Sequence, residues 1–402
     1  MHIRSLSLEN FRTYTRLELE CPPGPILLCG SNAQGKTSLL EAIYCLSTGH
    51  SPLTHVDRHL INWTAAEQDM GYARLRAEVV SRSRALEIAL ALANSQTRTG
   101  AQRLQKQIRI DRQVRQPRHL TGCLNVVLFL PQDIDLVAGP PAGRRRYLDD
   151  TLAQVDADYS AALDVYREAL RQRNALLRHL AERGGDASQL DPLDARLARS
   201  GVVLCQSRRR LIADLSRYAT RIHSELTGGQ EWLKLEYHPN FDPALPPGLA
   251  YQMPMGELSG PPDGISADDL VNAFRAELDR RRKDEIARGM TLTGPHRDEM
   301  RFTADGVDLG TFGSRGQQRT AVLALKMAQR EWMTETAGEP PVLLLDEVLA
   351  ELDMQRRAFL LAQVGQVEQA LLTATDPTMF GADFLSRALL LRVERGIVGP
   401  YT

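Results

Sequence analysis

The chain has 402 residues, of which 43% are hydrophobic and 25% charged, a balance typical of a globular protein with room for a large core and a second domain. Its formal net charge is −1, so any binding of nucleic acid would depend on local basic patches. The five cysteines are scattered, without a C-x-x-C pair, which argues against a zinc site and a disulfide framework. No apolar stretch reaches the roughly 18 residues of a membrane span, and the N-terminus lacks a signal-peptide core. We therefore expect a soluble, cytoplasmic protein.

The N-terminal segment predicts β-strands. Apolar residues recur at Ile3, Leu6 and Leu8, and residues 17–20 alternate with a period of two, as half-buried strands do. Arg12 lies in the turn between these segments, close in sequence to the phosphate site described next. It is a candidate contact to a nucleotide, and the alternative is a solvated turn arginine.

A glycine-bearing loop follows the apolar run 25–29 and precedes the helix-like segment 39–46. It has the pattern G-x-x-x-x-G-K-[ST], which in a strand–loop–helix context is typical of a phosphate-binding P-loop. Its N–H groups would form an anion nest, Lys36 would bind the β- and γ-phosphates, and Thr37 would ligate Mg²⁺. The alternative is a tight strand-to-helix turn with an exposed lysine. The predicted ATP-binding residues are Gly30, Ser31, Asn32, Ala33, Gln34, Gly35, Lys36, Thr37 and Ser38, together with Arg12.

Residues 71–115 predict an antiparallel meander, because three segments alternate between polar and apolar residues, with a turn expected at 97–100. The apolar run 125–130 is then suited to a buried strand. Gln132 follows the end of this strand and is a candidate contact to Mg²⁺ or to the attacking water. The alternative is an ordinary loop glutamine.

A helical hairpin is predicted over residues 151–229. Apolar residues recur at heptad-like spacing from Leu163 to Leu180 and again from Leu197 to Ile222, with a polar break between the two sets. Both helices carry several arginines, which form either an ordinary solvated face or a surface that binds the phosphate backbone of DNA. The candidates for DNA contact in the second helix are Arg208, Arg209 and Arg210.

Residues 239–266 are rich in proline and glycine and predict a loop or linker, followed by a helix that ends in the basic run 280–283. His296 has no second histidine at ligand spacing, which argues against a metal role.

A second motif, at residues 313–320, precedes an apolar helix. Ser314 and Gln317 fit a capping box. The same residue types, with glycine N–H groups at a helix N-terminus, would also present a second phosphate-binding surface. In the ABC family, which this pattern resembles, such a surface meets the P-loop of a second subunit across a dimer. The residues predicted to act in trans are Ser314, Gly316 and Gln317.

The apolar run 341–345 predicts a buried parallel strand that ends in two carboxylates. Asp346 would hold the Mg²⁺ shell, and Glu347 would orient or deprotonate the attacking water. A strand followed by two acids is a weak signal by itself and a strong one beside a P-loop.

Two further acids are candidates for a switch or dimer contact. Asp353 lies in a turn that could reach the opposite ATP site. Asp376 follows the apolar strand 370–372, where ABC proteins carry a switch histidine that this chain lacks, and Thr375 is the alternative substitute for it.

Lys36 and Asp346 lie far apart in the sequence, whereas a P-loop fold brings these motifs close, so a large insertion must separate them. We predict an α/β fold, an ABC-type P-loop ATPase head with an inserted α-helical arm, a short antiparallel coiled coil. The head would comprise residues 1–150 and 230–402, and the arm residues 151–229.

The chain resembles the RecF family of SMC-like ABC-type ATPases along nearly its whole length. The P-loop is generic, but the arginine triplet and the Gly-Pro-His-Arg-Asp segment are specific to that family. Gln132 and Pro140 depart from its usual acidic and small residues, which leaves the conformation of that loop open. The triplet Arg144, Arg145 and Arg146 either contacts DNA or packs within the protein. The segments that carry the resemblance are 8–12, the P-loop, 139–149, 172–174, 293–298, 314–320 and 344–353.

The resemblance implies ATP and Mg²⁺ as cofactors and ATP-driven dimerisation of the heads. It also implies binding to double-stranded DNA near gap junctions, and slow, DNA-stimulated ATP hydrolysis that releases the dimer. RecF-family proteins work with RecR and RecO, and through them with RecA, which they help to load on gapped DNA in replication-fork repair and SOS induction.

Three other functions fit the residues less well. An ABC-type ATPase subunit coupled to a membrane or protein partner is the main alternative, although the basic arm suits DNA better. A purely structural DNA-binding protein would not need Glu347 beside a P-loop. A metabolic P-loop kinase would have no use for the segment around Ser314.

Overall fold

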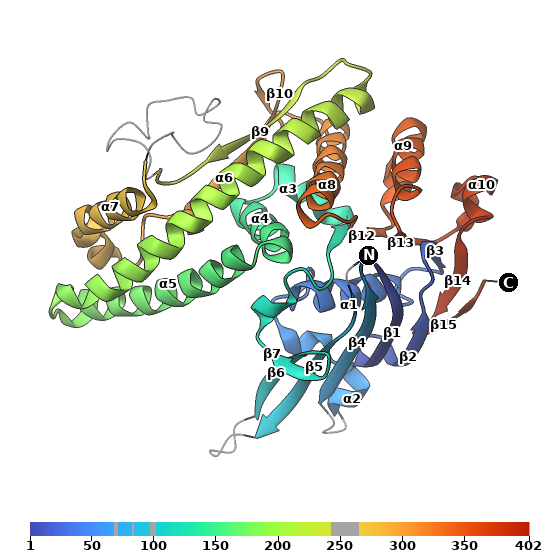
Figure 1. Cartoon of the computed structure of the whole chain (residues 1–402), viewed down its shortest axis with the longest axis horizontal. Coiled ribbons are helices and arrows are strands. Elements are labelled where there is room, and N and C mark those ends of the chain that lie inside the picture. Colours follow the sequence, from blue (N-terminus) through green and yellow to red (C-terminus); the bar gives the residue numbers. More distant parts are fainter. Residues whose placement is uncertain (68–70, 83, 97–101, 243–264, 402) are drawn as a thin grey trace. The chain divides into compact units, whose positions relative to one another are not determined.

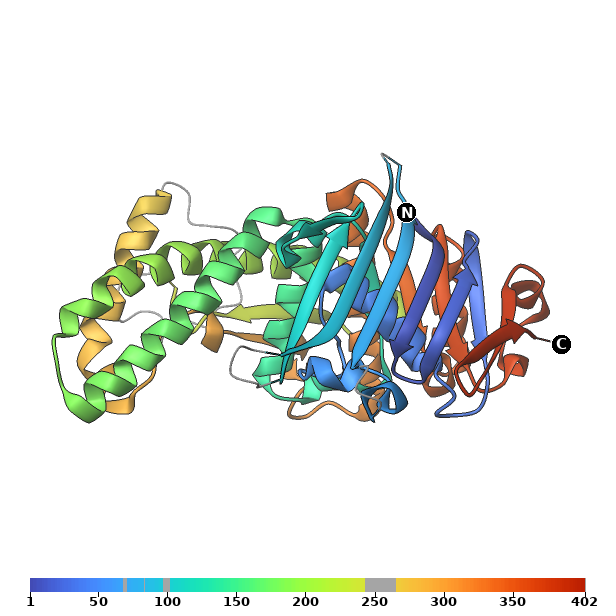
Figure 2. The same cartoon turned by 90° about the horizontal axis from the view of Figure 1, so that it is seen from below.

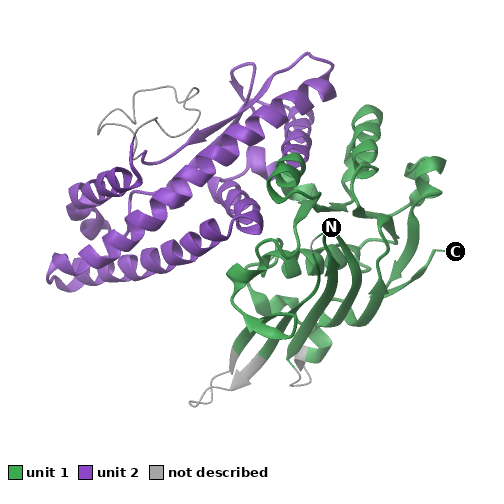
Figure 3. Cartoon of the chain, in the orientation of Figure 1, with its two compact units in different colours: residues 1–133, 329–402 green, residues 134–328 purple. Residues whose placement is uncertain are grey.

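The computed structural model describes residues 1–67, 71–82, 84–96, 102–242 and 265–401 (Figure 1). The chain forms two compact units (Figure 3). Unit 1 comprises residues 1–133 and 329–402, and unit 2 comprises residues 134–328.

An antiparallel sheet forms much of the N-terminal part of unit 1. Its strand order is β2-β1-β4-β5-β6-β7, and each neighbouring pair is antiparallel, which confirms the predicted meander. The turn expected at 97–100 lies outside the described residues. The strands are β1 His2–Phe11, β2 Tyr14–Glu20, β4 Tyr72–Val80, β5 Ala85–Gln96, β6 Gln102–Ile110 and β7 Gln113–Arg115.

A second, mostly parallel sheet in unit 1 has the order β15-β14-β3-β13-β12-β8. The adjacent strands β13, β12 and β8 of this sheet are buried along their whole length, as expected of parallel strands covered on both faces. This confirms the buried strand predicted before Asp346. The strands are β3 Gly24–Cys29, β8 Val126–Phe129, β12 Val342–Asp346, β13 Gln369–Ala374, β14 Leu389–Glu394 and β15 Ile397–Pro400.

Helix α1 Lys36–Thr48 lies between the two sheets of unit 1 (Figure 1). It contacts strands of both, and Leu39, Leu40, Ile43 and Leu46 are fully buried. Burial of each such side chain contributes about 1.5–3 kcal/mol. The helix that begins at the P-loop lysine is therefore fixed by the main core of unit 1.

Short helices and α9 complete unit 1. They are η1 Asp57–Leu60, α2 Trp63–Glu67, η2 Pro117–Leu120, η3 Pro131–Ile134, η6 Val348–Glu351, α9 Met354–Val364, η7 Pro377–Met379 and α10 Ala382–Leu385.

Unit 2 is built around two long helices, α5 Ala157–Arg183 and α6 Asp191–Thr227, which run antiparallel side by side (Figure 1; Figure 2). α5 is followed directly by Gly184, whose φ of +67° favours glycine. These helices confirm the predicted hairpin. The remaining elements are α3 Asp135–Ala138, α4 Pro141–Val155, η4 Ala187–Leu190, β9 Leu233–His238, α7 Ala267–Arg288, η5 Pro295–Arg297, β10 Glu299–Ala304, β11 Val307–Asp308 and α8 Arg315–Ala337, which ends in unit 1.

The predicted arm, residues 151–229, lies wholly inside unit 2, but this unit is larger than the arm. The contacts of Arg173 on α5, which is completely buried, explain why the unit extends beyond the arm. Its guanidinium lies 2.6 Å from Asp194 of α6 and 2.7 Å from Glu285 of α7. A buried cation needs such partners, so the two hairpin helices pack with α7 as one body.

Within the described residues, no helix is both long enough and apolar enough to cross a membrane.

Candidate functional site

The P-loop connects β3 to α1 and its backbone conformation requires glycine at two points. Gly35 has a φ of +114°, and a Cβ there would lie 2.6 Å from Oγ1 of Thr13. A Cβ at Gly30 would lie 2.2 Å from the carbonyl oxygen of Val393 on β14. The Tyr14 hydroxyl on β2 donates to the Gly35 carbonyl at 2.9 Å, and the Gly30 N–H donates to the Ala374 carbonyl on β13 at 3.2 Å, so two strands hold the ends of the loop.

Lys36 is the first residue of α1, and its side chain folds back over the loop. Its Nζ lies 2.6 Å from the carbonyl oxygen of Gly30, 3.0 Å from that of Ser31 and 2.9 Å from Oε1 of Glu347. These contacts match the three donors of an ammonium group. Only 4% of Lys36 is exposed, so its charge is concentrated on the inner face of the loop.

Asp346 at the end of β12 lies beside Thr37. The Thr37 hydroxyl is 2.8 Å from one oxygen of this carboxylate and 3.0 Å from the other. Burial raises the pKa of Asp346 above its ordinary value. A hydroxyl and a carboxylate at one strand edge are the hard oxygen donors that Mg²⁺ prefers, so these residues fit the ion.

Glu347 is the residue after the strand, and its φ of +52° places it in the left-handed region, which is uncommon for a non-glycine residue. Its N–H donates to Oγ1 of Thr373 on β13 at 2.9 Å. Its carboxylate reaches Lys36, as described above. The strand order β3-β13-β12 explains how residues so distant in sequence meet, since parallel strands end at the same sheet edge.

Arg12 and Gln132, also predicted near the nucleotide, have different surroundings. Arg12 makes a two-pronged contact with Glu41 of α1, at 2.8 and 2.6 Å, and donates to the carbonyl of His59. It is therefore not a freely solvated turn arginine, and it braces the P-loop helix. Gln132 is exposed in η3 after β8, the strand next to β12. Nucleotide and metal contacts by these two residues stay predictions.

The two candidate switch acids both cap short segments. Asp353 accepts the N–H of Arg356 at 2.9 Å at the start of α9, and Asp376 accepts that of Thr378 at 2.8 Å at the start of η7. These backbone hydrogen bonds lower the pKa of both carboxyls. Both side chains are exposed, and their role across a dimer stays a prediction.

The second motif forms the capping box expected from the sequence. The Gln317 N–H donates to Oγ of Ser314 at 3.2 Å, and the Ser314 N–H donates to the Gln317 side-chain oxygen at 3.0 Å. Glu231, just before β9, accepts from the Gln317 amide nitrogen at 2.8 Å. Ser314 and Gly316 are exposed at the N-terminus of the 23-residue helix α8.

Sequence reasoning missed two residues of these sites. Thr373 could have been found, because it is a polar residue at the end of the predicted strand 370–372, where the side chains of neighbouring strands converge. Glu231 has no such signal. Its contact with Gln317 joins segments that nothing in the local pattern connects.

Three of the six arginines predicted to contact DNA are buried, and the structure corrects their assignment. Arg208 lies 2.6 Å from Asp149 and 3.3 Å from Asp298, and only 3% of its side chain is exposed. Arg209 pairs with Asp242, and Arg144 pairs with Glu299 at 2.6 Å. A buried cation pairs with a carboxylate because unpaired burial is costly, so none of the three is free for phosphates. The remaining three are Arg145, which donates to the Asp298 carbonyl, Arg146, which lies 3.6 Å from Asp150, and Arg210, which is exposed.

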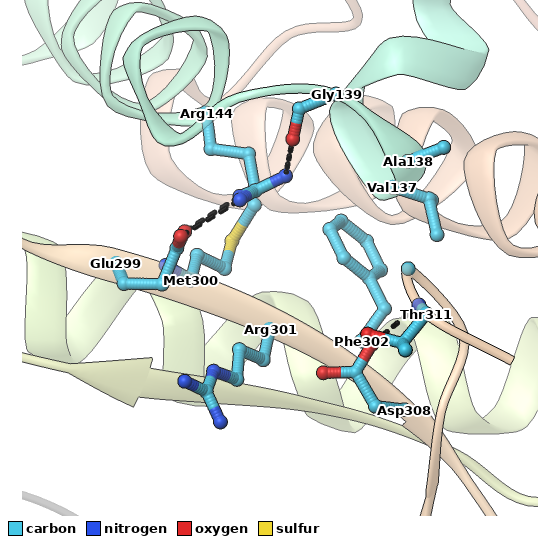
Figure 4. Close-up of a pocket in the computed structure, with 11 residues that line it drawn as sticks. Val137, Ala138, Gly139, Arg144, Glu299, Met300, Arg301, Phe302, Asp308 and Thr311 are labelled. Carbon is cyan, nitrogen blue, oxygen red and sulfur yellow. Dashed lines mark hydrogen bonds and ion pairs between the residues drawn. The ribbon is translucent and has the colours of Figure 1, made fainter.

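The buried Arg144 helps to line a cavity of about 310 Å³ in unit 2. Figure 4 shows the cavity between the α3–α4 corner, β10 and the turn after β11. The Arg144 guanidinium donates to both oxygens of Glu299 and to the carbonyl of Gly139, so its charge is neutralised at the wall. In the described part of the chain, no group of three or more His, Cys, Asp and Glu residues could hold a metal ion.

Comparison with known proteins identifies the family. A family model described as the RecF/RecN/SMC N-terminal domain matches residues 2–390. A DNA replication and repair protein RecF of Chloroflexus aurantiacus is 42% identical over 99% of this chain and 99% of its own length. The chain belongs to the RecF family. The RecF of Bacillus subtilis is 34% identical over 98% of this chain and 99% of its own.

Solved structures agree with this assignment. A structure of the recombination mediator protein RecF with ATP in the RecFOR pathway matches with a TM-score of 0.83 and 26% identity, over 100% of this chain and 98% of that one. An Smc head bound to the C-terminal winged-helix domain of ScpA has a TM-score of 0.51 at 13% identity, over 100% and 97%, a likeness of fold alone. The predicted fold class, an SMC-like ABC-type ATPase head with a helical insertion, is thereby confirmed for this RecF-family chain.

Proposed function

We propose that this RecF-family protein is an ATP-dependent DNA-binding protein of recombinational repair and replication-fork maintenance. ATP joins two copies into a dimer that binds double-stranded DNA near gap junctions, and slow, DNA-stimulated hydrolysis releases it. The observation that carries the proposal is the cluster of Lys36, Thr37, Asp346 and Glu347 at one sheet edge.

Each member of this cluster has a separate task in ATP hydrolysis. Lys36 binds the β- and γ-phosphates in place of its present contacts with loop carbonyls and Glu347. Thr37 and Asp346 would hold Mg²⁺, which neutralises charge on the phosphates when bound. Glu347 accepts a proton from the attacking water or orients that water toward the γ-phosphorus.

The second motif supplies the other half of each composite site. Ser314, Gly316 and Gln317 of one copy bind the triphosphate that Lys36 of the other copy holds. Support comes from the position of these residues at the start of a 23-residue helix whose terminal N–H groups attract anions, where Ser314 and Gly316 are exposed. Such a site closes only while the γ-phosphate is present, so ATP holds the two copies together and hydrolysis separates them.

The proposals of DNA binding and of protein partners are inferred from membership of the RecF family. The RecF relatives are named as DNA replication and repair proteins, and the matched ATP-containing structure belongs to the RecFOR pathway. We infer RecO and RecR as partners and the loading of RecA on gapped DNA as the outcome. Of the predicted basic residues, the exposed Arg210 is the best-placed candidate for phosphate contact.

Light-scattering mass of the Glu347→Gln protein tests the proposal, measured with ATP, with ADP and without nucleotide. A dimer in ATP alone is expected, because the variant binds ATP without hydrolysing it. The Lys36→Ala protein is the matched control and should stay monomeric in all three conditions. A Glu347→Gln mass that does not respond to ATP would contradict the composite site.

Binding of a gapped DNA duplex by the same two proteins tests the second half of the proposal. The ATP-bound dimer should bind the duplex, and its affinity should fall as salt rises, because phosphate contacts release counterions. Equal affinity of the Lys36→Ala monomer for the duplex would show that DNA binding does not depend on ATP and would contradict this part of the proposal.

A further inference from the structure

We propose that Thr373 is a positioning residue for the ATPase reaction, because its single hydroxyl holds both Asp346 and Glu347 in place. Thr373 is the fifth residue of β13, the strand between the P-loop strand β3 and β12. The proposal rests on the proposed function in one respect, since it assumes that ATP is hydrolysed at this cluster.

The fold aims the Thr373 side chain at the carboxylates. Thr373 is the register partner of Asp346 in the parallel pair β12–β13, and register partners present their side chains on the same face of a sheet. Thr373 is 4% exposed, so its hydroxyl must find partners within the protein.

The chemistry of the groups fixes the direction of the two hydrogen bonds. The Glu347 N–H can only donate, so Oγ1 of Thr373 accepts from it at 2.9 Å. The one proton of the hydroxyl is then free for Oδ1 of Asp346, which lies 2.8 Å away. Thr373 is thus a bridge that accepts from one residue of the acidic pair and donates to the other.

The bridge matters because each acid is held by few other contacts. The Asp346 carboxylate is hydrogen-bonded in the described structure by Thr37 and Thr373. When Mg²⁺ is bound, the Thr37 hydroxyl would ligate the ion instead of donating to Asp346. The hydrogen bond from Thr373 would then be the one that fixes the orientation of the Asp346 carboxylate. Metal-ligating carboxylates depend on such outer contacts for their orientation.

For Glu347 the bridge fixes the backbone. Its positive φ turns the chain sharply after β12, and the Thr373 hydroxyl holds the N–H at this turn. The direction of the Glu347 side chain toward the site follows from that turn. The next residue of β13 ties the same edge to the P-loop, since the Ala374 carbonyl accepts the N–H of Gly30 at 3.2 Å.

Thr373→Val tests the proposal, because valine keeps the shape and the strand preference of threonine and removes the hydroxyl. We expect kcat for ATP to fall about 10- to 100-fold with little change in KM, as for other outer-shell contacts of metal sites. The Mg²⁺ concentration for half-maximal binding of a fluorescent ATP analogue should rise by about tenfold. In EDTA, the affinity of the Thr373→Val protein for the analogue should stay within about twofold of that of the unaltered protein, because Lys36 still binds the phosphates.

Thr373→Ser restores the hydroxyl and should recover both kcat and the Mg²⁺ dependence. Thr303→Val, on strand β10, is the matched control for loss of a strand threonine and should resemble the unaltered protein. Thr373→Ala gives a second hydroxyl-free variant if the valine protein does not fold, which thermal unfolding monitors.

The outcomes are distinguishable from those of the proposed function. Hydroxyl-free variants with unaltered kcat and Mg²⁺ dependence, in a protein that turns over ATP, would overturn the positioning role alone. Failure of Thr373→Ser to recover activity would also overturn it. An unaltered protein that neither binds nor hydrolyses ATP would overturn both proposals.

Discussion

Nζ of Lys36 lies 2.9 Å from Oε1 of Glu347, so the proposed phosphate ligand and the proposed base of the reaction are an ion pair. Lys36 is buried and about a third of Glu347 is exposed, so the pair is only partly screened by water. A γ-phosphate that binds Lys36 would compete with this carboxylate and at the same time release it toward the attacking water.

The pair predicts opposite effects of Glu347→Gln on binding and on turnover. Turnover should fall by about 10²- to 10⁴-fold, the usual contribution of a general base. Affinity for ATP should rise, because a neutral amide competes less for Lys36 than a carboxylate does. Titration with a fluorescent ATP analogue and a phosphate-release assay measure the two quantities.

Glu335→Gln, an exposed position on α8, is the control for loss of one negative charge and should change neither quantity. If Glu347→Gln weakened nucleotide binding, competition between the carboxylate and the phosphate would be refuted.

Ser314→Ala should separate ATP binding from dimerisation. The P-loop of the same chain is untouched, so affinity for ATP should stay within about twofold, whereas the ATP-dependent dimer should be lost. The substitution also removes a helix cap, which costs about 1 kcal/mol. Sedimentation velocity with ATP measures the dimer.

Ser266→Ala controls for that cap. Ser266 caps α7 in the same way, accepting the Asp269 N–H at 3.1 Å, so its loss should cost similar stability. We expect the Ser266→Ala protein to dimerise normally. A normal dimer in Ser314→Ala would instead rule out the trans contact.

Arg208 and its neighbour Arg210 should differ in what they support. Arg208→Met removes the cation between two buried carboxylates, Asp149 and Asp298, and should destabilise the protein by about 3–5 kcal/mol. Arg210→Met changes an exposed side chain of the same helix and should cost less than about 0.5 kcal/mol. Urea denaturation measures both. Equal losses in the free energy of unfolding would show that the buried ion pairs of Arg208 do not stabilise the protein.

The sequence predicted the parts of the site that local patterns encode. Lys36, Thr37, Asp346 and Glu347 each belong to a motif next to an apolar strand, and the rule that parallel strands end at one edge brings those motifs together. The capping box at Ser314 was predictable for the same reason, because it spans four residues.

Which of the arginines are buried and paired with carboxylates could not be predicted in this way. Arg208, Arg209 and Arg210 are consecutive on one helix and carry the same charge. Spacing places only Arg208 on the apolar face, four residues after Leu204, although Arg209 is buried as well. Their difference depends on Asp149, Asp298 and Asp242, which come from distant segments. Burial of a charge is decided by tertiary partners, and a helical pattern records only which face is apolar.

His296 should make the stability of unit 2 depend on pH. Its ring nitrogens contact the Tyr166 hydroxyl at 2.7 Å and the Thr291 carbonyl at 3.3 Å. Burial lowers its pKa to about 4, and the positive charges of Arg297, Arg145 and Arg173 act in the same direction. The folded protein therefore holds a neutral imidazole at neutral pH.

The sign of the effect follows from the ordinary pKa of histidine, about 6.5 in the unfolded chain. Between pH 6.5 and about 4 the unfolded chain binds the proton and the folded chain does not, so acid favours unfolding. Stability from this residue is complete above pH 6.5 and is lost as the pH falls toward 4. From pH 7 to pH 5 the loss should be about 2 kcal/mol.

His296→Gln keeps a polar side chain at this position and removes the titration. Unfolding free energies from urea denaturation at pH 7, 6 and 5 should show that the unaltered protein loses about 2 kcal/mol more than the variant over this range. Carboxylates elsewhere titrate in both proteins and cancel in the difference. Parallel pH profiles for the two proteins would mean that His296 is protonated as readily in the folded chain as in the unfolded one, which its buried contacts with Tyr166 and Thr291 argue against.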